Sequence, residues 1–254
     1  MSRDEFRRVV HNDPVDVGLA CLLMGREMEP DLDPSEGLRA LDQLAATVPP
    51  ANSRDPAECA TALRATLAEF GGTPEDYADL RSSLLHAVLS RKRGLPILLT
   101  VVWVEVAKRA NLPAFPVGLP GYFLAGIGSR DGRHVLVDPF AHGAPVDPTP
   151  AGARPYNDRE VVLRVLNNVR AQAAARPALV ESARTALWAV ELSLLLPRHP
   201  VSLRRDRGLL LGQVGDFAQA AAQLEEYAEL VSEVDRAAAE EARREARLAL
   251  ARLN

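Results

Sequence analysis

The sequence is poor in cysteine, in long apolar runs and in net charge of either sign. It has two cysteines, Cys21 and Cys59, in 254 residues, so a disulfide framework like that of small secreted domains is not expected. Its longest apolar runs, such as residues 94–104, are too short to span a bilayer. No N-terminal stretch combines a basic start, an apolar run and a small-residue cleavage site. These absences predict a cytoplasmic protein with two buried thiols and no membrane partner.

Charge and histidine spacing exclude two further classes of protein. Acidic and basic residues are interspersed and leave a formal net charge of −4, which argues against a nucleic-acid surface. The basic patch of residues 91–93 is too short to change this. His11, His86 and His199 are scattered at no spacing typical of metal ligands. We therefore expect no nucleic-acid partner, no metal and no cofactor.

The chain has a helical pattern at both ends and a mixed pattern in the middle. We expect a helical N-terminal region over residues 1–72, an α+β core over 73–154 and a helical C-terminal region over 155–254. The expected fold class is therefore α+β and mostly helical.

The middle region holds the most apolar helix and several short strands. The pattern predicts a helix over about residues 96–110, with Pro96 in its first turn and Asn111 as a C-cap. Strands are expected in "AFPVGL", "GYFLAGIG" and "RHVLVDPF", with "SRDGR" as a tight connecting turn.

The C-terminal region contains "RDRGLLLGQVGDFAQAAAQLEEYAEL" (205–230). Its Gly-Asp-Phe-x-x-Ala, between two amphipathic helices, is typical of the turn of a tetratricopeptide-like hairpin. The pattern covers about one and a half repeats, which is too few for an independent solenoid.

The layout of residues 94–138 is one that often carries a nucleophile, a base and a carboxylate. A nucleophile at a helix N-terminus gains from the positive end of the helix dipole. A histidine on a neighbouring strand can take its proton, and a carboxylate on the next strand orients the imidazole. Here Pro96 occupies the helix start, and neither cysteine lies in the core region. The residues themselves therefore count against catalysis.

The segment "DYADLRSSLLHAVLSRKRGLPILLTVVWVEVAKRANLPAFPVGLPGYFL", followed by "VLVDPF", resembles the SirB family of transglutaminase-like proteins. The resemblance covers residues 76–140, and the tetratricopeptide-like tail follows the core as it does in that family. It implies a transglutaminase-like (papain-like) core, in which a central helix packs on a small antiparallel sheet.

Carried over position by position, the resemblance implies a site that has lost its chemistry. In catalytic relatives the helix starts Gly-x-Cys, and that cysteine falls at Pro96, where the SirB branch commonly has proline. The histidine of the family's Pro-Gly-His is Tyr122, and only the aspartate is retained, as Asp138. The family's Asn-Ser corresponds to Ser82-Ser83.

These comparisons define a vestigial site of Pro96, Thr100, Tyr122 and Asp138. Thr100, at the end of the family's Thr-Leu-Ser, lies about one turn into the helix. We expect its hydroxyl to bond the carbonyl four residues back. Tyr122, a poor base because tyrosine has an ordinary pKa of about 10, is expected to face the helix start and to donate to Asp138. Asp138 itself is expected to brace the Asp-Pro-Phe loop.

Two histidines near this site do not complete a triad. His134 lies four residues before Asp138 on the same strand, roughly 13 Å away by strand rise. His142, in "DPFAHG", has no candidate nucleophile to serve.

The function that follows is binding rather than catalysis. We expect a non-catalytic transglutaminase-like protein that binds a protein or peptide through the old cleft, the helical tail or both. The alternative is a hydrolase or transamidase that acts on amide or peptide bonds with an unconventional site around Thr100, Tyr122 and Asp138. Binding of a small ligand in the old cleft is a third possibility. The identity of the partner and the oligomeric state stay open.

Overall fold

The structure, a computed structural model, describes residues 2–50, 55–176 and 180–253. It divides into two compact units, residues 1–165 and 166–254. The first unit contains helices and the sheet, and the second contains helices only, so the α+β class is confirmed.

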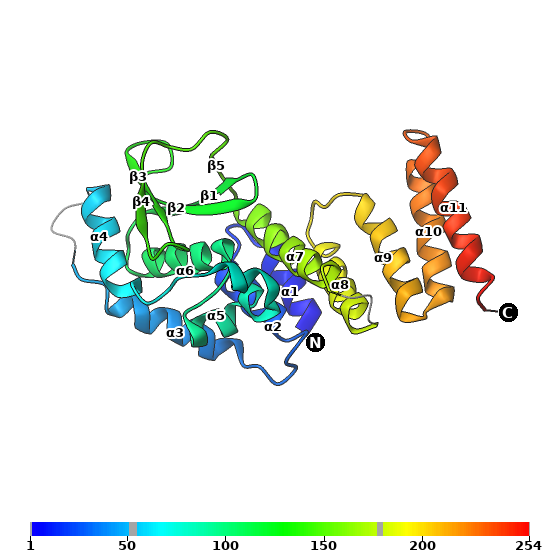
Figure 1. The fold of residues 1–254 in the computed structure, drawn as a ribbon, viewed down its shortest axis with the longest axis horizontal. Coiled ribbons are helices and arrows are strands. Elements are labelled where there is room, and N and C mark those ends of the chain that lie inside the picture. The colour runs from blue at the N-terminus through cyan, green and yellow to red at the C-terminus, as the bar shows by residue number, and fades with distance from the viewer. Residues whose placement is uncertain (1, 51–54, 177–179, 254) are drawn as a thin grey trace. The chain divides into compact units, whose positions relative to one another are not determined.

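The first unit starts with six α-helices and continues into the sheet (Figure 1). Its helices are α1 (Ser2–His11), α2 (Val17–Gly25), α3 (Pro34–Ala46), α4 (Pro56–Leu67), α5 (Leu85–Arg91) and α6 (Pro96–Arg109). The 3₁₀ helices η1 (Pro74–Ala78) and η2 (Leu80–Ser83) precede α5. The strands are β1 (Ala114–Leu119), β2 (Tyr122–Gly128), β3 (His134–Asp138), β4 (Ala144–Val146) and β5 (Arg154–Pro155).

The sheet is antiparallel, in the order β4-β3-β2-β1-β5. The three strands that the sequence predicts are present as β1, β2 and β3. The two that it does not predict, β4 and β5, contain Pro145 and Pro155. Both are edge strands, where a missing backbone N–H is tolerated.

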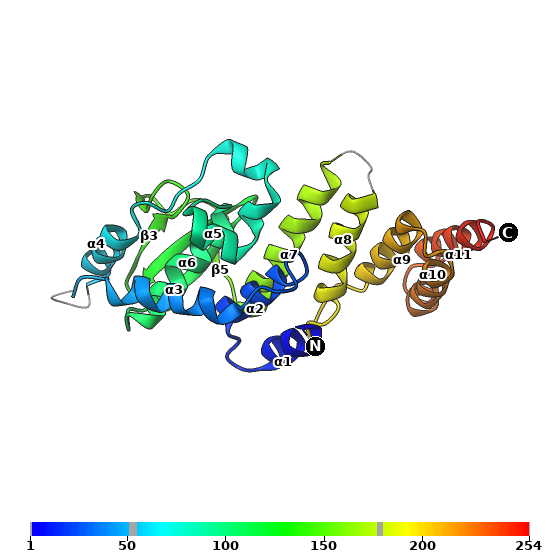
Figure 2. The same cartoon turned by 90° about the horizontal axis from the view of Figure 1, so that it is seen from below.

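Helix α6 is the centre of the first unit, and its expected position is confirmed. Pro96 is in its first turn, where no intrahelical N–H bond is lost. The helix packs on β1 and β2 with one side and on α2, α3 and α5 with the other. Figure 1 shows α6 below the sheet, and Figure 2 shows α3 in front of it when the unit is viewed from below. Enclosure on both sides explains why α6 is apolar around most of its circumference.

Asn111, expected as the C-cap of this helix, lies one residue beyond the C-cap Ala110. It has a φ of 57°, the left-handed conformation that asparagine tolerates after a helix. Its N–H bonds the Lys108 carbonyl at 3.1 Å.

In the second unit, each helix from α8 to α11 packs against the next one along the chain. Helix α7 (Asp158–Ala174) begins in the first unit and ends in the second. It is followed by α8 (Val180–Ser193), α9 (Ser202–Val214), α10 (Phe217–Val231) and α11 (Arg236–Leu250). Helix α10 packs against both α9 and α11.

The expected hairpin turn between α9 and α10 is confirmed. Gly215 has a φ of 92°, so it ends α9 in a left-handed conformation that suits glycine. Asp216 then caps α10 by accepting a bond from the Gln219 N–H at 3.1 Å. At Gly208 a Cβ would lie 2.7 Å from Leu224 Cγ, so glycine lets α9 approach α10 closely.

Candidate functional site

Tyr122 and Asp138 are joined across neighbouring strands. The Tyr122 hydroxyl donates to Asp138, with Oδ2 at 3.0 Å and Oδ1 at 3.2 Å. Ala125 pairs with Val137 in the β2–β3 register, which makes Tyr122 and Asp138 diagonal neighbours on one face of the sheet. The contact expected between these two vestigial positions is therefore confirmed.

Asp138 also holds the loop that follows its strand. Its Oδ1 accepts bonds from the backbone N–H groups of Phe140 at 2.9 Å and Ala141 at 3.3 Å. Its backbone carbonyl accepts from Gly143 at 2.8 Å. The carboxylate thus has the loop-bracing role that the sequence predicts.

The Tyr122 ring lies in an aromatic and apolar setting. It packs against a cluster of Phe115, Val117, Leu124 and Leu136 on its own face of the sheet. It also meets the Phe140 ring edge to face, with centroids 6.1 Å apart. Burial raises the pKa of Tyr122, and the nearby Asp138 charge raises it further. A phenol that keeps its proton and donates it to a carboxylate is a poor general base. Whether Tyr122 faces the first turn of α6 stays a prediction.

Thr100 has a different environment from the one expected. It is completely buried in α6, and its Oγ1 has no hydrogen-bond partner among the described residues. The expected bond to the carbonyl four residues back is therefore wrong. Threonine in a helix divides between χ1 rotamers, and the sequence does not determine which one packing selects. A hydroxyl with neither a base nor access to solvent is badly placed to attack a substrate.

The two histidines near the site each contact a backbone carbonyl. His134 Nδ1 lies 3.1 Å from the Gly132 carbonyl, and His142 Nδ1 lies 3.1 Å from the Ala68 carbonyl. Within the described part of the chain, no group of three or more His, Cys, Asp or Glu side chains could hold a metal ion.

Both cysteines are buried on N-terminal helices, and neither is in a disulfide. Burial raises the pKa of the Cys21 thiol, and the negative charges of Glu105 and Asp16 raise it further. Both cysteines precede the core region in the sequence, but their helices pack on it. Helix α2 packs on α6, and α4, which carries Cys59, packs on β2, β3 and α6.

A buried carboxylate that the sequence does not predict, Asp76, lies just before α5. Asp76 is 1% exposed and accepts bonds from the Thr73 N–H at 2.8 Å, the Ser82 hydroxyl at 2.9 Å and the Arg93 guanidinium at 3.2 Å. Burial alone raises the pKa of Asp76, but these three donors together bring it below its ordinary value.

This network is joined to the start of α6. The backbone carbonyl of Ser82 accepts a bond from the Leu95 N–H at 2.9 Å, directly before the helix. Asp76 thus helps to position the first turn of α6 through Ser82. Its only sequence signal is the acidic and hydroxyl-rich "DYADLRSS", which does not show that Arg93 is a partner.

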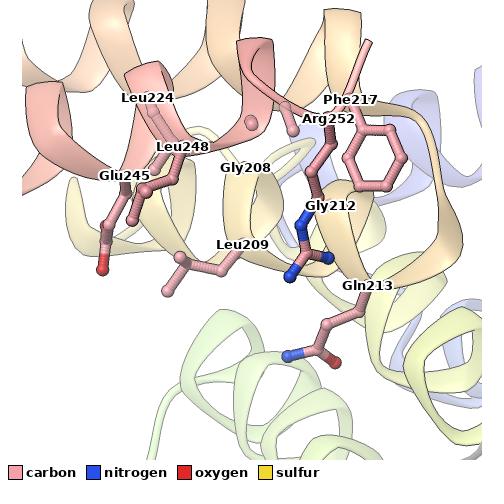
Figure 3. A pocket seen from close by; sticks show the side chains of 11 residues that line it. Gly208, Leu209, Gly212, Gln213, Phe217, Leu224, Glu245, Leu248 and Arg252 are labelled. Atoms are coloured by element: carbon pink, nitrogen blue, oxygen red, sulfur yellow. The ribbon is translucent and has the colours of Figure 1, made fainter. Parts of the chain in front are cut away.

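Adjoining hollows lie along α9 in the second unit. The first, of about 300 Å³, is enclosed by α9, α10 and the end of α11, with Leu209, Phe217, Leu224 and Leu248 among its walls (Figure 3). A second hollow, of about 480 Å³, lies between α7 and α9, and a third, of about 540 Å³, continues toward α8. The second shares Leu209 and Gln213 with the first, and Leu210 and Gln213 with the third. We name these three hollows the α9 groove. The sequence predicts a helical tail here but not the residues of the groove.

Comparison with known families agrees with both halves of the fold. Residues 35–154 match the model of the transglutaminase-like superfamily, and residues 174–254 match a tetratricopeptide-repeat model. The central part of the chain is therefore similar to transglutaminase-like proteins, and the part after it is similar to tetratricopeptide repeats. The resemblance inferred from the sequence is confirmed.

The relatives are similar along part of their length. A UPF0162 protein of Xylella fastidiosa (strain Temecula1) is 32% identical over 181 residues, which is 63% of each chain. A UPF0162 protein of Pseudomonas aeruginosa is 32% identical over 152 residues, 58% of this chain and 52% of the relative. F-box only protein 21 of Mus musculus is 34% identical over 56 residues, 22% of this chain and 9% of that protein. No solved structure matches the chain. Among the described residues, no helix has both the length and the apolar character needed to cross a bilayer.

Proposed function

We propose that this protein is a non-catalytic transglutaminase-like protein that binds a protein or peptide through the α9 groove. The observation that carries the proposal is the groove itself. It is a continuous row of hollows with apolar walls, in a region that matches a tetratricopeptide repeat. Apolar concave surfaces of this kind gain free energy by covering their walls with a partner's side chains.

The vestigial site supports the non-catalytic half of the proposal. Pro96 offers no nucleophile, and Tyr122 gives its hydrogen bond to Asp138. The alternative, a hydrolase or transamidase, would need Thr100 as the attacking group. Complete burial of Thr100 counts against that enzyme.

The same proposal includes the organisation and location expected from the sequence. It keeps the three regions 1–72, 73–154 and 155–254, of which the first two lie within the first structural unit. It places the protein in the cytoplasm, in agreement with two buried thiols that form no disulfide. It requires no metal and no cofactor.

Site-specific photo-crosslinking tests the groove. A benzophenone amino acid replaces Leu248, which lines the groove and is 63% exposed. We expect it to trap a discrete partner in the source cells, identifiable by mass spectrometry. The matched control places the same group at Arg244, an exposed α11 residue outside the groove lining. Equal crosslinked products from both positions would refute binding at the groove. So would products that persist when Leu209→Asp places a carboxylate in the groove lining.

A further inference from the structure

The acidic side chains that line the α9 groove are already neutralised. Asp206 pairs with Arg170, and Glu245 pairs with Arg205 at 2.8 Å. Neither carboxylate is therefore left to attract a cationic partner.

The remaining charges of the lining are two arginines. Arg252 lines the first hollow, between α9 and α11, and Arg176 lines the third, beside α8. Both are exposed, and neither forms an ion pair with any carboxylate that the structure describes. The Arg252 guanidinium lies over the Phe217 ring, 5.6 Å from its centroid, and reaches into the hollow beside Gly212 (Figure 3).

These arginines lie in different outer hollows, with the second hollow between them. That hollow shares Leu209 with the Arg252 side and Leu210 with the Arg176 side. The second hollow is lined mainly by alanine and leucine side chains, and the only charges in its lining are the paired Arg170 and Asp206. The groove thus presents a mainly apolar middle without net charge and an uncompensated positive charge toward each end.

We propose that the groove selects an apolar segment of a partner protein that carries acidic side chains on both sides. This inference rests on the proposed function and specifies the chemistry of the partner. The apolar middle provides affinity because it loses water on binding, and the arginines favour acidic flanks and repel basic ones. A protein with a net charge of −4 repels acidic partners in general, so two local cations give this site selectivity. Nucleic acid fits poorly because it requires a row of cations rather than two.

The sequence preference of the groove can be determined without a known ligand. A phage-displayed library of random peptides is selected for binding to the full chain. We expect the enriched peptides to have Leu, Ile, Phe or Met in the middle with Asp or Glu on both sides. One enriched peptide is then synthesised with a fluorophore and titrated by fluorescence polarisation. Its affinity should fall when the acids become Gln, and fall further when they become Lys.

The decisive variant reverses the charges of the two groove arginines. Arg176→Glu combined with Arg252→Glu should lower the affinity for the acidic peptide by about tenfold at low ionic strength. The loss should be smaller at high salt. The control combines Arg184→Glu with Arg244→Glu. These two residues are exposed, lie on α8 and α11, and line none of the three hollows. The control has the same net charge and should change the affinity by less than about twofold.

The outcomes separate this inference from the proposed function. Enriched apolar peptides without acids, whose binding is abolished by Leu248→Asp, would overturn the charge selection and leave groove binding intact. Equal losses from both double variants would show a general charge effect and overturn the inference. Absence of any groove-dependent peptide would also overturn it, while the crosslinking experiment would still decide the proposed function separately.

Discussion

The Tyr122 hydroxyl lies 3.0 Å from Oδ2 of Asp138. The family resemblance implies that these are the positions of a base and its orienting carboxylate in catalytic relatives. An imidazole in this place would hold a lone pair ready to take a proton. The Tyr122 phenol instead keeps its proton and donates a hydrogen bond to the Asp138 carboxylate. The pair connects β2 to the loop after β3.

Tyr122→Phe should lower the free energy of unfolding by about 1–3 kcal/mol, because it removes a hydrogen bond to a charged, partly buried acceptor. Urea denaturation measures the change. Asp138→Asn and the double variant complete a cycle that isolates the pair. Strictly additive effects of the two substitutions would show that the hydroxyl contributes nothing to Asp138.

Asp76→Asn should lower stability at neutral pH by about 2–4 kcal/mol, because the charge that Thr73, Ser82 and Arg93 solvate is lost. The pKa of Asp76 is lowered by folding, so its contribution is present above the unfolded pKa of about 4 and disappears as the pH falls through the native value.

The measurement for Asp76 is a set of urea unfolding curves between neutral and strongly acidic pH. The wild type should lose stability at acidic pH more steeply than Asp76→Asn does. Glu69→Gln is the surface control, because this carboxylate is exposed beside Lys92. Parallel pH profiles for the wild type and Asp76→Asn would contradict the role given to this network.

Thr100→Val should raise the free energy of unfolding by about 1 kcal/mol, because it replaces a buried hydroxyl without a described partner by a methyl group of similar size. Thr100→Ala, which lacks both γ-methyl groups of valine, should be about 2–3 kcal/mol less stable than Thr100→Val. Thermal unfolding ranks the variants. If Thr100→Val were folded and stable but inactive in partner binding or turnover, Thr100 would be functional after all.

The thiols should be inert in the folded protein. Cys21 and Cys59 are each 1% exposed, so a thiol reagent should modify them only after local or global opening. Labelling followed by intact mass should show slow modification in buffer and fast modification in denaturant. Rapid labelling of either cysteine in the native state would contradict this assignment.

The sequence predicts the elements whose signals are local. The apolar run of α6 and the alternating residues of β1 to β3 can be read directly. The edge strands β4 and β5 are not predicted because each contains a proline, which argues against a strand. These prolines are tolerated because both strands lie at the edges of the sheet.

The site shows the same distinction between local and long-range signals. Family positions are sufficient to predict the contact between Tyr122 and Asp138. The Asp76 network joins residues from 73 to 93 through loops, and the α9 groove depends on how several helices pack. Neither arrangement leaves a periodic pattern. The Thr100 rotamer depends on packing as well, so the expected hydrogen bond failed.

The most direct test of the account measures both binding and chemistry on the trapped partner. The purified partner is titrated with the wild type, with Leu248→Asp and with Tyr122→Phe, and its intact mass is recorded after long incubation. We predict that Leu248→Asp weakens binding by at least about tenfold, that Tyr122→Phe binds like the wild type, and that the partner's mass does not change. Cleavage of the partner, or loss of ammonia from it, that Tyr122→Phe abolishes would contradict a non-catalytic binding protein.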